Sequence, residues 1–244
     1  MAEFKIEIAG QVFAVQSLFD STRDYCRAYL TQQDAQYSIT VTRDHLQFEQ
    51  DFLRAEAIEE GIRIRTFTDP FLERAAIQRQ VADLLLHHNT LLLHGSAVAV
   101  DGQGYLFTAK CGTGKSTHTR LWRQVFGDRA VMINDDKPFI CLSGDGAVIC
   151  GAPWSGKHGL DTNIAVPLKG ICILERGIEN RISPIVPVEA REMLHKQSCL
   201  PLDAALLHAH HELVEQLLSH VSLWRMECNK EIDAAITAHR AMSV

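Results

Sequence analysis

The segment that most constrains the fold is a glycine-containing loop between a strand-like run and a helix-like run. Residues 107–117 read FTAKCGTGKST. A turn that ends in Gly-Lys-Ser/Thr, with a strand before it and a helix after it, is the pattern of a phosphate-binding loop. Such a loop points successive backbone N–H groups into one concavity at a helix N-terminus. The pattern predicts an α/β fold that holds a nucleotide; an incidental glycine-rich turn is the alternative.

The loop supplies a contiguous set of candidate nucleotide-binding residues. Glycines permit its tight backbone path, a lysine brings positive charge to the terminal phosphates, and a serine hydroxyl is available to Mg²⁺. The set comprises Cys111, Gly112, Thr113, Gly114, Lys115, Ser116 and Thr117. Alanine replaces the usual first glycine at position 109. We expect Ala109 to be tolerated if its φ is negative, because a methyl group then costs little.

A pair of aspartates follows the next strand-like run, in the segment INDDKP. Asp135 lies twenty positions after Lys115, an interval that fits one helix and one strand. A parallel return places Asp135 and Asp136 at the carboxyl edge of the sheet, beside the loop. Neighbouring strand-end residues point to different sides, so one carboxylate can meet a metal and the other a phosphate acceptor. The alternative is a solvated Asp-Asp turn.

Further candidates lie in GAPWSGKHGLDTN, residues 151–163, and at the end of the next strand. Lys157 is a candidate electrophilic contact to the γ-phosphate, and Trp154 a candidate stacking residue. An ordinary loop with a buried tryptophan and a solvated lysine explains the segment equally well. Arg176 could bind phosphate or form a surface ion pair with Glu175 or Glu179. The clustered histidines His208, His210 and His211 are expected on a helix face and not in a metal site.

Three features in this order resemble the HPr kinase/phosphorylase family and, more distantly, the phosphoenolpyruvate carboxykinases. They are a His-Gly pair (His94-Gly95) before a hairpin, the loop in the form xxxGxGKST, and the Asp135-Asp136 pair one helix later. The resemblance covers about residues 85 to 180, less than half of the chain. Two features depart from the family pattern: Ala109, and the absence of the glutamate-bearing signature, in whose place residues 151–163 stand.

The resemblance implies a role for each matching residue. Lys115 and the loop amides would hold the β- and γ-phosphates, and Ser116 and Asp136 would hold Mg²⁺. Asp135 would be the general base that accepts the proton of the acceptor hydroxyl, and His94 would lie near the phosphates or near Asp135. The implied function is an ATP-dependent kinase that phosphorylates a hydroxyl, with serine of a peptide or protein as the favoured acceptor. The alternatives are a small-molecule hydroxyl kinase and a non-transferring ATP-binding regulatory protein.

The resemblance and the residue patterns together predict the domain organisation. We expect a small N-terminal α+β region over residues 1–67. Residues 68–244 are expected to form a P-loop domain of the HPr kinase/phosphoenolpyruvate carboxykinase type, with a mixed sheet and a helical C-terminal part. The hairpin turn of this domain is expected at Asp101-Gly102-Gln103-Gly104.

Composition limits the partners that we expect. The net charge is −6 without a basic run, which weighs against nucleic acid. No stretch reaches 18 apolar residues, so no membrane span is expected, and the N-terminus carries charges where a signal peptide needs an apolar run. Seven scattered cysteines suggest reduced thiols, so a cytoplasmic location is expected. The expected ligands are Mg²⁺, ATP as substrate, and a peptide, protein or small-molecule hydroxyl acceptor. Homo-oligomer formation is expected only by analogy with the family.

Overall fold

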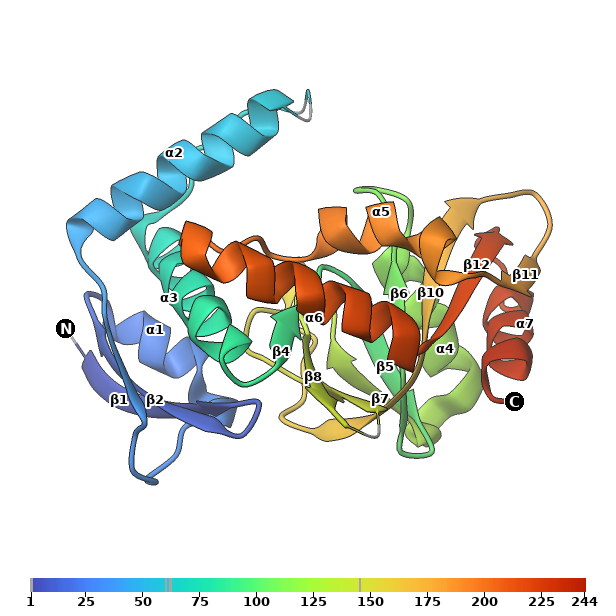
Figure 1. Ribbon diagram of the computed structural model, residues 1–244, viewed down its shortest axis with the longest axis horizontal. Helices are drawn as coiled ribbons and strands as arrows, with labels where there is room; N and C mark the ends of the chain where they lie inside the picture. The colour runs from blue at the N-terminus through green and yellow to red at the C-terminus, as the bar shows by residue number, and fades with distance from the viewer. Residues whose placement is uncertain (1, 60, 62, 145) are drawn as a thin grey trace. The chain divides into compact units, whose positions relative to one another are not determined.

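The computed structural model describes residues 2–59, 61, 63–144 and 146–244. It is a mixed α/β protein that packs as two compact units, residues 1–84 and 85–244 (Figure 1). The N-terminal unit contains a three-stranded sheet, and the C-terminal unit contains a mixed nine-stranded sheet. In the part of the chain that the structure describes, no helix is both long enough and apolar enough to cross a membrane.

The N-terminal unit is built on a hairpin of β1 (Ala2–Ile8) and β2 (Gln11–Ser17), with β3 (Tyr37–Thr40) parallel to β2. Helix α1 (Asp20–Tyr25) and the 3-10 turn η1 (Arg27–Tyr29) follow the hairpin. Two longer helices come next, α2 (Arg43–Glu59) and α3 (Asp69–Leu86). The sequence analysis did not predict α2.

Most of helix α3 belongs to the N-terminal unit, so the division falls after Leu84 and not after residue 67. Buried polar contacts explain this position. The carboxylate of Glu73 in α3, itself fully buried, accepts hydrogen bonds from the backbone N–H of Leu18 and the hydroxyl of Thr22. Farther along α3, Arg79 makes two hydrogen bonds of 2.6 and 3.0 Å to Glu49 of α2. Moving α3 away would leave buried charge without a partner.

The C-terminal unit is organised around its long strand β10 (Ala165–Arg176), which belongs to both halves of the curled sheet. The start of β10 pairs antiparallel with β9, and its later residues pair parallel with β6 and β12. The strand order is β4-β8-β9-β10-β6-β5-β7, with β12 beside β10 and β11 beside β12. The strands are β4 (Thr90–Leu92), β5 (Ser96–Val100), β6 (Gln103–Thr108), β7 (Ala130–Asn134), β8 (Phe139–Ser143), β9 (Gly146–Cys150), β11 (Arg181–Pro184) and β12 (Ser222–Cys228).

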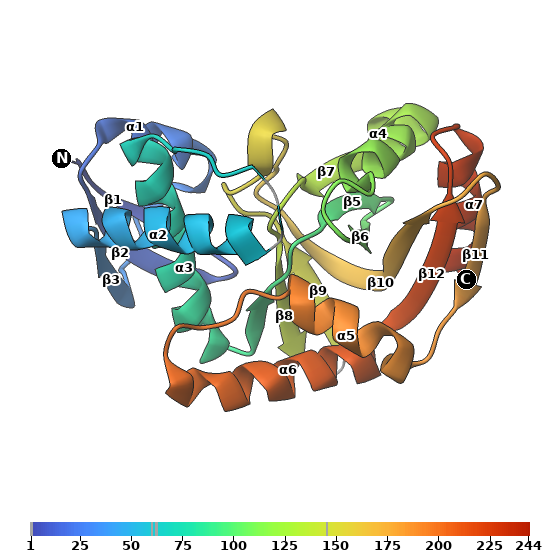
Figure 2. The ribbon, with the colours of Figure 1, turned by 90° about the horizontal axis from the view of Figure 1, so that it is seen from above.

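Helices cover both faces of this sheet, and a hydrophobic cluster fills the space on each side. Figure 2 shows α5 and α6 on one side of β10 and α4 and α7 on the other. The helices are α4 (Lys115–Phe126), α5 (Pro187–Gln197), α6 (Leu207–His220) and α7 (Asp233–Met242), with the 3-10 turns η2 (Gly127–Arg129), η3 (Gly156–His158) and η4 (Ala204–Leu206). This layered arrangement holds the ends of β6, β7 and β10 in fixed positions relative to one another.

The β5–β6 hairpin turns at Asp101-Gly102, with φ of +51° and +77° at these two residues, so the turn is shorter than the four residues predicted and β6 begins at Gln103. The sequence suggested that the chain returns from β6 to β7 within a parallel sheet, and the structure differs from this in one respect. Strand β5 is inserted between β6 and β7 and is antiparallel to both. Strands β6 and β7 therefore still run in the same direction, and their carboxyl ends reach the same edge.

Candidate functional site

The predicted phosphate-binding loop connects β6 directly to α4. Gly112 (φ +74°) and Gly114 (φ +127°) adopt backbone conformations that residues with side chains rarely accept. No side chain caps the start of α4. The first N–H groups of a helix have no intrahelical acceptor, so this uncapped end offers donors and a positive dipole to an anion.

Ala109 occupies the first position of the loop without strain. It is not among the described residues with positive φ. Its side chain is fully buried in the apolar cluster that includes Phe107, Leu121 and Trp122. The methyl group therefore contributes packing at the base of the loop. The carbonyl oxygen of Ala109 accepts a 3.0 Å hydrogen bond from Nζ of Lys115, which places the lysine head group over the loop.

The two predicted aspartates lie at the carboxyl edge of the sheet but have different surroundings. Asp135 is 8% exposed, and its Oδ1 atom accepts a 2.6 Å hydrogen bond from the hydroxyl of Ser96. The hydroxyl oxygens of Ser96 and Thr119 are 2.7 Å apart. Since Ser96 has a single hydroxyl hydrogen, Thr119 donates to it. This buried chain links Asp135 to helix α4, one turn beyond Ser116.

Asp136 is more accessible, with a side chain that is 33% exposed, and it forms an ion pair with His94 (Oδ1 to Nε2, 3.3 Å). Burial alone would raise the pKa of Asp136. The hydrogen bond and charge of His94, together with the charges of Lys137 and Lys115, outweigh burial and lower this pKa below its usual value. The structure thus pairs His94 with Asp136. The carboxylate stays ionised near the lysine of the loop.

A residue that we did not single out, Asn134, holds the acidic segment and the following loop together. Its fully buried side chain accepts hydrogen bonds from the backbone N–H groups of Asp136 (2.8 Å) and Lys137 (2.6 Å). Its amide nitrogen donates to the carbonyl oxygens of Ala152 (2.7 Å) and Trp154 (3.3 Å). Asn134 is the second residue of INDDKP, and a polar residue at the end of an apolar strand was the available signal.

The loop over residues 151–163 approaches Asp136 at Gly156. A Cβ atom added to Gly156 would lie 3.2 Å from Cβ of Asp136, and this glycine has a φ of +69°. The next residues, Lys157 and His158, are exposed. Trp154, in contrast, is buried and packs edge-on against Phe139 with ring centroids 6.3 Å apart, so its ring is part of the core. The structure therefore brings Gly156, the residue before Lys157, to Asp136, and it excludes Trp154 as an exposed stacking surface.

Arg176 reaches the phosphate-binding loop from the end of β10. Its guanidinium donates a 2.6 Å hydrogen bond to the carbonyl oxygen of Gly112. The ion pairs considered from the sequence do not form, because Glu175 pairs with Arg225 and Glu179 pairs with Arg181. The pairing of β10 with β6 explains this position, since both strands end at the loop edge.

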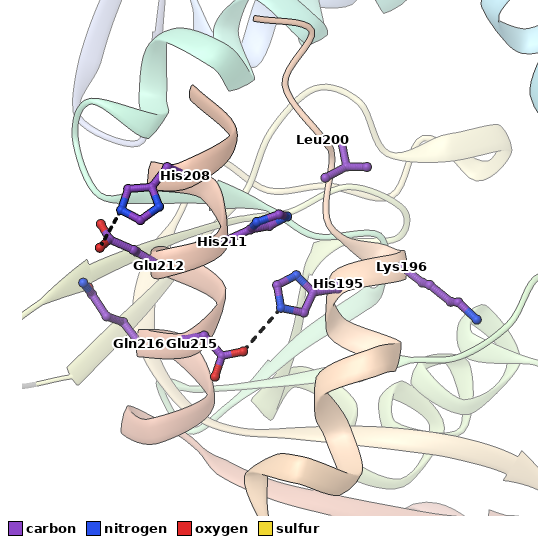
Figure 3. Close-up of a pocket in the computed structure, with 8 residues that line it drawn as sticks. All are labelled: His195, Lys196, Leu200, His208, His211, Glu212, Glu215 and Gln216. Carbon is purple, nitrogen blue, oxygen red and sulfur yellow. Dashed lines mark hydrogen bonds and ion pairs between the residues drawn. The ribbon is translucent and has the colours of Figure 1, made fainter. Parts of the chain in front are cut away.

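The histidine-rich helices form a separate hollow, of about 870 Å³, between α5 and α6 (Figure 3). It is lined by His195, Lys196, Leu200, His208, His211, Glu212, Glu215 and Gln216. Figure 3 shows His195 and His211 facing each other, and His195 pairs with Glu215 at 3.4 Å. His210 is fully buried below this surface. Among the described residues, no group of three or more His, Cys, Asp or Glu is arranged to hold a metal ion.

The chain has a distant structural relative and no match in sequence to a known family. No model of a protein family matches the sequence, and no curated protein matches it. Among solved structures, the chain is similar to the HPr(Ser) kinase/phosphatase from Coxiella burnetii, with a TM-score of 0.36 and 9% sequence identity over 62% of this chain and 97% of that chain.

Proposed function

We propose that the chain is an ATP-dependent kinase that transfers the γ-phosphate of Mg-ATP to a hydroxyl, with serine of a peptide or protein as the favoured acceptor. The observation that carries this proposal is the ionised, partly exposed Asp136, paired with His94 at the mouth of the phosphate-binding loop. A protein that only stores a nucleotide needs the loop and a metal ligand. A second, accessible carboxylate beside the loop is what transfer to a hydroxyl requires.

In this proposal the loop from Cys111 to Thr117 binds the phosphates. Gly112 and Gly114 permit the backbone path, and Lys115 supplies charge to the β- and γ-phosphates. The uncapped start of α4 adds N–H donors. Arg176, held on the carbonyl of Gly112, keeps further N–H groups available beside the nucleotide.

The surroundings of the two aspartates favour exchanging the roles that the family resemblance implied. The Ser96–Thr119 hydrogen bonds direct Asp135 toward α4, where Ser116 lies in the first turn. We therefore assign the Mg²⁺ contacts to Ser116 and Asp135, whose oxygen atoms are the hard ligands that this ion prefers. When bound, Mg²⁺ neutralises charge on the phosphates.

Asp136 is then the group that receives the proton. The acceptor oxygen attacks the γ-phosphorus, the bond from that phosphorus to the bridging oxygen breaks, and ADP leaves with the bond's electron pair. The hydroxyl proton passes to the carboxylate of Asp136, which His94 holds in place. A lowered pKa makes Asp136 a weak base, which suits a loose transition state in which the proton leaves late. Exposed Lys157, after Gly156, provides a cation for the γ-phosphate.

Paired amide substitutions test this assignment. Asp136→Asn should retain Mg-ATP binding and lower transfer of labelled γ-phosphate by about 10² to 10⁴-fold, the usual contribution of a positioned base. Asp135→Asn should instead weaken binding of Mg-ATP while affecting binding of metal-free ATP little. Nucleotide binding is measured by calorimetry with and without Mg²⁺. A wild-type rate of transfer in Asp136→Asn would refute the role of Asp136. Label in a metabolite would favour the small-molecule kinase, and Mg-ATP binding without any transfer would favour the regulatory protein.

A further inference from the structure

Two cysteines on neighbouring strands lie in contact outside the proposed kinase site. Cys141 is in the middle of β8 and Cys150 is the last residue of β9, and their Sγ atoms are 3.6 Å apart. The strands are antiparallel, with Cys141 opposite Val148 and Cys150 opposite Phe139. The cysteines are therefore diagonal neighbours on the same face of the sheet. Ile140, which precedes Cys141 on β8, points to the other face of the sheet and into the core.

The two thiols differ in exposure and in acidity. Cys141 is partly exposed, whereas Cys150 is buried with 5% of its surface accessible. The hydrogen bond with Cys150 lowers the pKa of the Cys141 thiol; burial opposes this shift, and a hydrogen bond with Thr90 adds to it. The same hydrogen bond, together with burial, raises the pKa of Cys150. Since the thiolate is the reactive form, Cys141 is both the more accessible and the more nucleophilic sulfur.

We propose that Cys141 and Cys150 form an oxidant-reactive pair that a peroxide converts into a reversible intrachain disulfide. The Cys141 thiolate attacks one peroxide oxygen, the O–O bond breaks, and hydroxide leaves, which gives a sulfenic acid. The Cys150 sulfur then attacks the sulfur of Cys141 and displaces water. In total, two thiols and one hydrogen peroxide give one disulfide and two waters, so the thiols are oxidised and the peroxide is reduced. A dithiol such as dithiothreitol reverses the bond by thiol–disulfide exchange.

This site is independent of the proposed kinase activity, although it lies close to the same loops in the chain. Strand β8 begins three residues after Asp136, and β9 runs directly into residues 151–158. A bond between these strands would join the bases of both loops. The oxidation itself requires no nucleotide, so its occurrence can be measured whether or not the chain transfers phosphate.

The sequence offers a direct assay on the full-length protein. Trypsin does not cleave before Pro138, so digestion yields residues 130–157 as one peptide whose only cysteines are Cys141 and Cys150. After treatment with hydrogen peroxide, alkylation and digestion without reductant, this peptide should weigh two hydrogen atoms less than the unalkylated reduced peptide and carry no alkyl group. Oxygen added to Met132 changes the mass in the opposite direction. Dithiothreitol before alkylation should restore two alkylated cysteines.

An internal control and two variants decide the outcome. Residues 111–115 form a tryptic peptide with the single exposed cysteine Cys111, which reports that the oxidant was active. Cys150→Ser should trap a sulfenic acid at Cys141 that dimedone labels, whereas Cys141→Ser should leave Cys150 unlabelled. The proposal is overturned if both cysteines of the wild-type peptide remain alkylated while Cys111 is oxidised. It is also overturned if dimedone labels Cys150 in Cys141→Ser as readily as it labels Cys141 in Cys150→Ser.

Discussion

The buried His118 should make the stability of the protein depend on pH in a way that one substitution removes. This residue lies in α4, two positions after Ser116, and is 2% exposed. Its Nε2 atom accepts a 3.1 Å hydrogen bond from the indole of Trp122, its ring packs on Phe107 with centroids 4.5 Å apart, and its Nδ1 atom has no described partner. Burial lowers the pKa of His118 from 6.5 to about 4.

A lowered histidine pKa stabilises the folded state above the unfolded pKa of 6.5, and this stability is lost as the pH falls toward about 4. At about pH 5 the unfolded chain is almost fully protonated at this position and the folded chain almost unprotonated. Linkage then gives a loss of about 2 kcal/mol in the free energy of unfolding between about pH 8 and pH 5 from this residue alone.

The variant for the test is His118→Gln, because glutamine offers an oxygen to the Trp122 indole but does not titrate. Urea denaturation of both proteins at several pH values gives the two stability curves. His210, whose pKa burial also lowers to about 4, is present in both proteins, so it cancels in the comparison. Between about pH 8 and pH 5, the free energy of unfolding of the variant should fall by about 2 kcal/mol less than that of the wild type. If the two curves of unfolding free energy against pH were parallel, the claim that burial keeps His118 neutral would be refuted, whatever the absolute stability of the variant.

Two further predictions concern the candidate site. Gly156→Ala should lower phosphate transfer because its new Cβ would meet Asp136 at 3.2 Å. Gly159→Ala is the matched control, since Gly159 also has a positive φ but an added Cβ would have nothing within 4 Å, and this variant should keep transfer. An equal loss of transfer in Gly159→Ala would show that backbone strain alone causes the loss. Arg176→Ala should weaken ATP binding about tenfold, because it removes a charge-assisted hydrogen bond to the carbonyl of Gly112. Thermal stability should not change, and Arg176→Lys should restore part of the affinity. Equal ATP affinities of the wild type and the alanine variant would contradict this prediction.

Local patterns predicted much of the site. The strand–loop–helix context of residues 107–117 and the Asp-Gly turn of the preceding hairpin depend on short-range rules, and the structure has both. The position of Asp135 and Asp136 at the loop edge also followed from one helix and one strand of ordinary length. That prediction survived the unexpected insertion of β5 between β6 and β7, because an antiparallel strand between them leaves both pointing the same way.

The sequence did not predict the contacts between segments that are far apart in the chain. The approach of Arg176 to Gly112 depends on β10 lying beside β6, across 64 positions of the chain. The partner of His94 depends on the direction in which each carboxylate leaves the strand end, which Ser96 and Asn134 determine through buried hydrogen bonds. Helix α2 was missed because several of its apolar side chains, such as Phe48 and Ile58, are exposed and give no clear core-facing stripe.

The central claim is transfer of the γ-phosphate of ATP to a hydroxyl, and one labelling experiment tests it most directly. The full-length protein is incubated with γ-labelled ATP, Mg²⁺ and an extract of the source organism, which is then separated into macromolecules and small molecules. Lys115→Ala is the control, since it removes the loop cation. We expect label in a phosphate ester, in the protein and peptide fraction, only with the wild-type protein. Wild-type protein that binds Mg-ATP but labels neither fraction more than Lys115→Ala would contradict the proposed kinase.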